Sequence, residues 1–86
     1  MAEIIIYTKD YCPYCVKIKE FLKAKGHAVT KEIDITHSPE LATEMVNRSG
    51  GRKTVPQVFI NGTHTGGCDD TIALDKEGKL EAILAS

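Results

Sequence analysis

Residues 4–15 of the chain are IIIYTKDYCPYC, and this stretch decides the fold. Three isoleucines and a tyrosine form an apolar, β-branched run of strand length, which predicts a strand over residues 3–8 inside a parallel sheet. Helical spacing follows over residues 13–25, where Ile18 and Leu22 fall on one face and lysines fall on the other. The chain therefore passes from a strand into a helix at two closely spaced cysteines.

The next segment completes a strand–helix–strand unit. Residues 27–35 alternate between apolar side chains such as Ile33 and Ile35 and polar ones such as Glu32 and Asp34, which predicts a half-buried second strand. A crossover this compact is expected to be right-handed. The two strands are therefore predicted to be parallel, with the helix packed on one face of the sheet.

Three further signals place the remaining elements. Ser38-Pro39 combines an N-cap with a proline at the first helical position, and this helix is predicted to end near residues 49–51. Asn61-Gly62 predicts a hairpin that joins strands over residues 57–60 and 63–65. Acidic residues after Gly66-Gly67 predict a last helix that starts at residue 68 or 69, ends at 76 and continues over 79–84 after Gly78.

The order of elements predicts an α/β fold in which βαβ is followed by α, a ββ hairpin and α. Its four strands can form one mixed sheet with helices on both faces. With 86 residues there is length for one domain, over residues 1–86, and no length for a second core.

Composition narrows the functional classes. Eleven Lys+Arg against twelve Asp+Glu give a net charge of -1, so no net positive field favours non-specific nucleic-acid binding. The apolar and charged fractions, 42% and 27%, are those of a soluble globular protein. Neither a signal peptide nor a membrane span is expected. Three cysteines are too few and too odd in number for a secreted disulfide framework, which favours a reducing compartment and a cytoplasmic location.

The two cysteines of Cys12-Pro13-Tyr14-Cys15 are expected to differ chemically. Cys12 lies at a helix N-terminus, where unpaired N–H groups favour negative charge, so we expect its pKa to be lowered. Cys15 lies one turn further on the apolar face and is expected to be buried. A C-x-x-C pair within a βαβ unit is typical of a redox pair, in which Cys12 attacks a disulfide and Cys15 resolves the mixed disulfide.

Two structural alternatives exist for this pair. Half of a zinc site would need further ligands from Cys68, His27, His37 or His64, but no second C-x-x-C or spaced histidine pair completes a tetrahedron. A purely structural disulfide is disfavoured in a cytosolic chain. The three histidines form no recognisable constellation, and we interpret them as surface residues.

Thr54-Val55-Pro56 is the second informative stretch, because the proline immediately precedes a predicted strand. A cis Val55–Pro56 bond would leave the Val55 backbone as a short unpaired edge for an extended peptide ligand. The alternative is an ordinary proline at the start of a strand.

Cys-Pro-Tyr-Cys, Thr-Val-Pro and Gly-Gly-Cys-Asp-Asp occur in that order, and on these motifs nearly the whole chain resembles the glutaredoxins. The resemblance implies a thioredoxin fold and an enzyme that uses glutathione, itself regenerated by glutathione reductase and NADPH, to reduce protein disulfides and glutathione mixed disulfides. It implies disulfide-bonded or glutathionylated proteins as partners, with ribonucleotide reductase as a candidate. A monomer without a metal is expected.

The resemblance also assigns roles to individual residues. It implies Cys12 as the nucleophile and Cys15 as the resolving thiol. The remaining residues are implied to contact glutathione: Tyr14 as one wall of its groove, Thr54, Val55 and Pro56 at its cysteinyl part, Gly67, Cys68, Asp69 and Asp70 at its γ-glutamyl end, and Lys9, Arg52, Lys53 and Gln57 at its glycine carboxylate.

Each assignment has a structural alternative. Asp69 and Asp70 suit the first turn of a helix as N-cap acids, and Lys9 and Arg52 suit a solvated surface. Tyr14 suits a packed surface position. Cys68 suits either a small buried hydrophobe or an extra reactive thiol.

Two rival functions remain open for the chain. One is a binding module in which the dithiol holds a metal or a glutathione-ligated iron–sulfur cluster, although Cys15 and Pro13 depart from the Cys-Gly-Phe-Ser of the cluster-carrying relatives. The other is a thioredoxin-like donor that depends on a flavoprotein reductase. Thioredoxins carry Trp-Cys-Gly-Pro-Cys, whereas this chain has no tryptophan.

Overall fold

A mixed sheet of four strands, in the order β2-β1-β3-β4, organises residues 2–86, which are the residues that the computed structural model describes. β1 pairs in parallel with β2 and antiparallel with β3, and β3 pairs antiparallel with β4. The strands are β1 (Ile4–Thr8), β2 (Lys31–Asp34), β3 (Gln57–Ile60) and β4 (Thr63–Gly66). The predicted mixed sheet and hairpin are thus confirmed.

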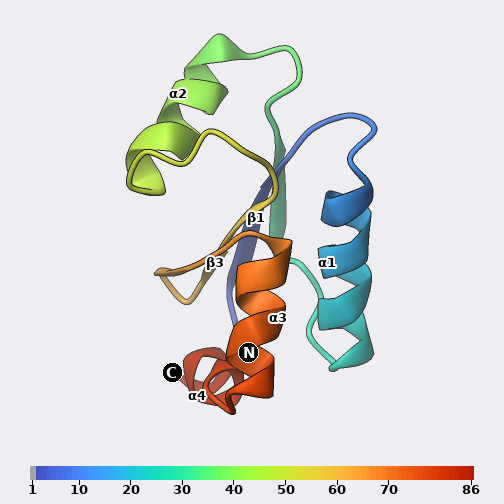
Figure 1. Cartoon of the computed structure of the whole chain (residues 1–86). Coiled ribbons are helices and arrows are strands. Elements are labelled where there is room, and N and C mark those ends of the chain that lie inside the picture. Colours follow the sequence, from blue (N-terminus) through green and yellow to red (C-terminus); the bar gives the residue numbers. More distant parts are fainter. Residues whose placement is uncertain (1) are drawn as a thin grey trace.

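Helices cover both faces of this sheet, as the sequence predicts. Figure 1 shows α1 and α3 on one side of the sheet and α2 on the other. The helices are α1 (Pro13–Ala24), α2 (Pro39–Arg48), α3 (Cys68–Lys76) and α4 (Leu80–Ala85). In residues 2–86, no helix is long and apolar enough to cross a membrane.

Alternation along β1 supplies a core to each face, because successive side chains of a strand point in opposite directions. Ile4 and Ile6 are fully buried against a cluster that includes Leu22 of α1. Tyr7 is fully buried on the opposite face, in a cluster with Met45 of α2. The strand that leads to the two cysteines is therefore fixed on both sides.

Local capping starts α2 where the sequence predicts it. The hydroxyl of Ser38 accepts a hydrogen bond from the Leu41 N–H at 3.2 Å, and Pro39 is the first helical residue. β2 is shorter than predicted, because β1 begins at Ile4 and its register with β2 begins at Ile5 opposite Lys31. Residues 27–29 precede the paired stretch and are not part of a strand.

Candidate active site

Cys12 and Cys15 form a disulfide across the first turn of α1, with their Cα atoms 5.2 Å apart. Cys12 is the N-cap residue, and its sulfur accepts a hydrogen bond from the Cys15 N–H at 3.2 Å. Cys12 is half-exposed, whereas Cys15 is only 2% exposed. The pair therefore presents one sulfur to solvent and keeps the other inside, which is the difference in burial that the sequence predicts.

A groove of about 340 Å³ lies between the start of α1, the loop before β3 and the start of α3. It brings together all of the predicted glutathione contacts except Lys9, Lys53 and Gln57. The lining residues are Tyr14, Arg52, Thr54, Val55, Pro56, Gly67, Cys68, Asp69 and Asp70.

One wall of the groove is the loop before β3. The Val55–Pro56 peptide bond is cis, which is one of the two alternatives that the sequence leaves open. Val55 is half-buried, and neither its N–H nor its carbonyl forms a hydrogen bond within the part of the chain that the structure describes. These backbone groups are therefore free to pair with an extended ligand.

The opposite wall is the first turn of α3, which the Asp70 carboxylate organises. Its Oδ2 accepts a hydrogen bond from the Gly67 N–H at 3.0 Å and lies 2.9 Å from the Arg52 guanidinium. These two interactions hold the pKa of Asp70 below its ordinary value. The N–H groups of Cys68 and Asp69, which follow Gly67, have no acceptor among residues 2–86.

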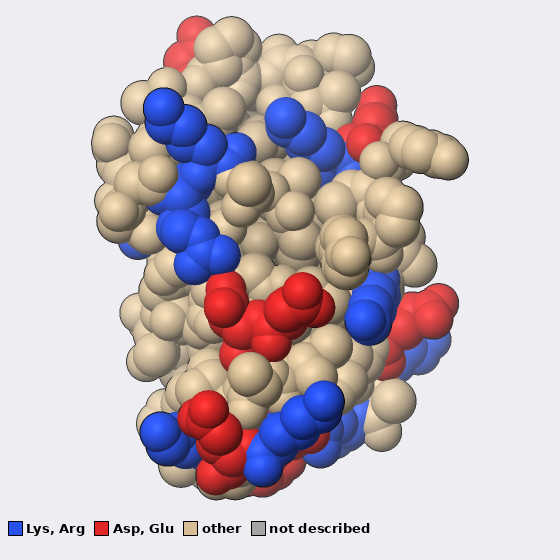
Figure 2. Space-filling model, in the orientation of Figure 1, with Lys and Arg blue, Asp and Glu red and all other residues tan. Residues whose placement is uncertain are grey.

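Charged side chains of both signs gather on the face of the molecule that Figure 2 shows. Acidic side chains lie in the middle of this face, with basic side chains on both sides of them. Positive and negative groups thus lie close together, as a zwitterionic ligand end would require.

Arg52 and Asp70 lie together, although the resemblance implies them at opposite ends of glutathione, the glycine carboxylate and the γ-glutamyl end. Their 2.9 Å ion pair places both side chains at one end of the groove. Lys9 and Lys53 are exposed and lie outside the residues that line the groove.

Gln57 and the histidines also require correction. Gln57 is fully buried, so its amide has no exposed atom to offer to a glycine carboxylate. His37 is exposed, as expected, but His27 and His64 are half-buried. Burial, together with the positive charge of Arg52, lowers the pKa of His64. His64 lies on the predicted hairpin strand, and its partial burial follows from its place opposite the buried Phe59 in the β3–β4 register.

Cys68 is 4% exposed and belongs to the core cluster below α1 and α3. Burial raises the pKa of its thiol. The structure therefore favours the interpretation of Cys68 as a small buried hydrophobe. Among the residues described, no three His, Cys, Asp or Glu side chains group in a way that could hold a metal ion.

A dithiol at a helix N-terminus, on a mixed sheet with helices on both faces, defines a thiol–disulfide oxidoreductase of the thioredoxin fold. The family model of glutaredoxins matches residues 4–65. The chain is also 45% identical over 86 residues to a glutaredoxin of Pseudomonas aeruginosa, with 100% of both chains covered. The chain belongs to the glutaredoxin family.

Solved structures agree with this assignment. The solution structure of a glutaredoxin from Brucella melitensis matches with a TM-score of 0.82 and 51% identity, over 98% of this chain and 89% of that one. A crystal structure of a buckwheat glutaredoxin–glutathione complex matches with a TM-score of 0.76 and 29% identity, over 98% and 77% of the two chains.

Proposed function

We propose that this glutaredoxin uses glutathione to reduce protein disulfides and glutathione mixed disulfides, with Cys12 as the nucleophile and Cys15 as the resolving thiol. The observation that carries this proposal is the difference in exposure within the pair. Only the sulfur of Cys12 can be reached by a bulky disulfide, whereas Cys15 is within reach of a mixed disulfide on Cys12.

On a glutathionylated protein, the Cys12 thiolate attacks the glutathione sulfur. The bond between the two substrate sulfurs breaks, and the protein leaves as a thiolate that takes up a proton from water. A second glutathione then attacks the sulfur of the glutathione held on Cys12. Oxidised glutathione forms, and Cys12 is released as a thiolate. Cys15 takes no part in this route.

On a protein disulfide, Cys12 forms a mixed disulfide with the target and releases the first target thiol. The Cys15 thiolate attacks Cys12, which releases the second target thiol and leaves the Cys12–Cys15 disulfide that the structure contains. Two glutathione molecules then reduce that bond and are themselves joined as oxidised glutathione. This route requires both cysteines.

The groove offers complementary groups along an extended tripeptide. The γ-glutamyl end carries one carboxylate and one ammonium. The free N–H groups at the start of α3 and the Arg52 guanidinium suit the carboxylate, and Asp69 and Asp70 suit the ammonium. The unpaired backbone of Val55 suits the cysteinyl part. The existence of a glutathione complex of the similar buckwheat protein supports this assignment.

The glycine carboxylate is left to the exposed Lys9, which lies outside the lined part of the groove. We further propose the cytoplasm as the place of action, with glutathione reductase and NADPH as the source of electrons. Glutathionylated proteins are the proposed partners, and ribonucleotide reductase is one candidate disulfide substrate.

The test is glutathione-dependent reduction of a small glutathione mixed disulfide, coupled to glutathione reductase and NADPH. Wild type and Cys15→Ser are expected to turn over, whereas Cys12→Ser is expected to be inactive. On an intramolecular protein disulfide, Cys15→Ser is expected to fail as well. An active Cys12→Ser would contradict the assignment of the nucleophile. A wild type that works only with thioredoxin reductase would contradict the use of glutathione.

A further inference from the structure

A partly buried relay of hydrogen bonds runs from β4 to the wall of the groove. The Gln57 Nε2 donates to the Thr54 carbonyl at 2.9 Å, and the Gln57 Oε1 lies 2.7 Å from the Nε2 of His64. Gln57 has no exposed surface. Thr54, at the end of this relay, lines the groove beside Val55. None of these contacts belongs to the redox chemistry of the two cysteines.

The relay fixes the protonation of the imidazole. Because the Nε2 of Gln57 faces the Thr54 carbonyl and hydroxyl, at 2.9 and 3.4 Å, its oxygen must be the atom that faces His64. An amide oxygen only accepts, so the Nε2 of His64 must carry a proton and donate it. A neutral His64 is therefore the Nε2–H tautomer.

Stacking holds the His64 ring in the plane that this hydrogen bond needs. His64 lies directly opposite Phe59 in the β3–β4 register, and their ring centroids are 4.8 Å apart at an interplanar angle of 28°. Phe59 is held in turn by the edge of Tyr7 at 5.8 Å and by the Arg48 guanidinium at 4.7 Å. The donor and its acceptor Gln57 thus stand on the two strands of the hairpin, whereas Thr54, at the far end of the relay, lies in the loop before β3.

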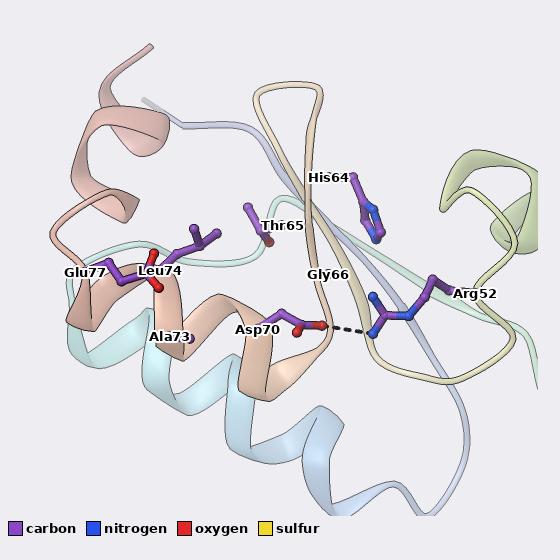
Figure 3. A pocket seen from close by; sticks show the side chains of 8 residues that line it. All are labelled: Arg52, His64, Thr65, Gly66, Asp70, Ala73, Leu74 and Glu77. Atoms are coloured by element: carbon purple, nitrogen blue, oxygen red, sulfur yellow. Dashed lines mark hydrogen bonds and ion pairs between the residues drawn. The ribbon is translucent and has the colours of Figure 1, made fainter.

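His64 also lies close behind the groove. It lines a second cavity of about 400 Å³ that shares Arg52 and Asp70 with the groove. Figure 3 shows the ring pointing from β4 toward Arg52, with the Arg52–Asp70 ion pair beside it. His64 could therefore act on the groove by two routes, through Gln57 or by a direct electrostatic effect of its imidazole on Arg52, and an experiment has to distinguish them.

We propose that His64 is a positioning residue for glutathione: through Gln57 it fixes the Thr54 carbonyl, and with it the orientation of the Thr54–Val55 backbone that lines the groove. The inference rests on the proposed function, because the positioned backbone acts on glutathione. It adds a residue that touches neither glutathione nor a reacting sulfur. Its expected effect is on the binding of glutathione adducts and not on the chemical step.

The kinetic test compares substitutions that separate the stacking of the His64 ring from the hydrogen bond that its N–H donates. His64→Phe keeps the stacked ring and removes the N–H donor, whereas His64→Gln keeps an N–H donor. His64→Phe is expected to raise KM for a glutathione mixed disulfide about three- to tenfold with kcat nearly unchanged, the range expected for the loss of one hydrogen bond. His64→Gln is expected to retain the wild-type KM. His37→Phe, at an exposed histidine, is the matched control.

A double-mutant cycle tests whether the effect passes through Gln57. In a Gln57→Leu background, adding His64→Phe is expected to change KM no further, because the relay is already broken. Urea unfolding of each variant shows that it is folded under the assay conditions. An unchanged KM in His64→Phe, or an equal KM change in both backgrounds, would overturn the proposal.

A measurement on the resting wild-type protein is independent of activity. A proton–nitrogen NMR spectrum of the His64 ring is expected to show the proton on Nε2 at neutral pH. Protonation on Nδ1 alone would overturn the relay even in a fully active enzyme. A wild type that shows the Nε2–H signal but no glutathione-dependent turnover would instead overturn the proposed function.

Discussion

Replacement of Gly66 by alanine is expected to disturb the groove and the stability of the fold together. Gly66 is the last residue of β4 and has a φ of +99°, a region that other residues rarely adopt. A Cβ built there would lie 2.6 Å from the Asp70 Oδ2 and 2.8 Å from the Asp70 Cβ. The carboxylate can rotate away, but the Cβ cannot, so β4 or the start of α3 has to move.

Three effects set the magnitude of the destabilisation. The positive φ costs an alanine about 1–2 kcal/mol. Displacing Asp70 removes its bond to the Gly67 N–H, worth about 1 kcal/mol at a helix start. The forced movement adds about 1–2 kcal/mol, as overpacking does elsewhere. We expect a loss of about 4 kcal/mol, which a domain with a stability of about 5–15 kcal/mol can survive.

Gly51→Ala is the matched control, because Gly51 has a φ of +103° and no atom within 4 Å of a built Cβ. It is expected to cost only the backbone contribution, about 1–2 kcal/mol. Urea unfolding followed by circular dichroism measures both variants, and Gly66→Ala is expected to be the less stable by about 2–3 kcal/mol. Equal losses in the two variants would refute the reasoning, because the contact with Asp70 would then carry no energy.

Two further predictions concern titration and thiol reactivity. The folded-state pKa of Asp70 is lowered, so its contribution to the free energy of unfolding is present above the ordinary value of 3.8 and is lost as the pH falls through the lower folded-state value. Asp70→Asn should therefore flatten the pH dependence of urea unfolding in that acidic range, and an unchanged profile would contradict the assignment. In the reduced native protein, iodoacetamide should label Cys12 quickly and Cys68 only on unfolding, because Cys68 is buried and its pKa is raised. Equal labelling rates by mass spectrometry would contradict this.

Local sequence signals were sufficient for the elements that carry the dithiol. An apolar run followed by a cysteine N-cap and Pro13 places a strand before a helix, and the structure begins α1 at Pro13. The hairpin at Asn61-Gly62 and the start of α2 after Ser38 follow from turn and capping chemistry in the same way. These features depend on residues that are neighbours along the chain, so the sequence is sufficient to predict them.

The sequence by itself therefore determined the order of the elements, the burial difference between Cys12 and Cys15, and the motifs that resemble the family. Only the tertiary structure decided that Arg52 pairs with Asp70, 18 residues away, and that Gln57 is buried between Thr54 and His64. Periodicity indicates which face of an element is apolar, but it does not indicate which polar side chains contact one another across loops. Those contacts depend on sheet order and register, which the packing of the whole chain fixes.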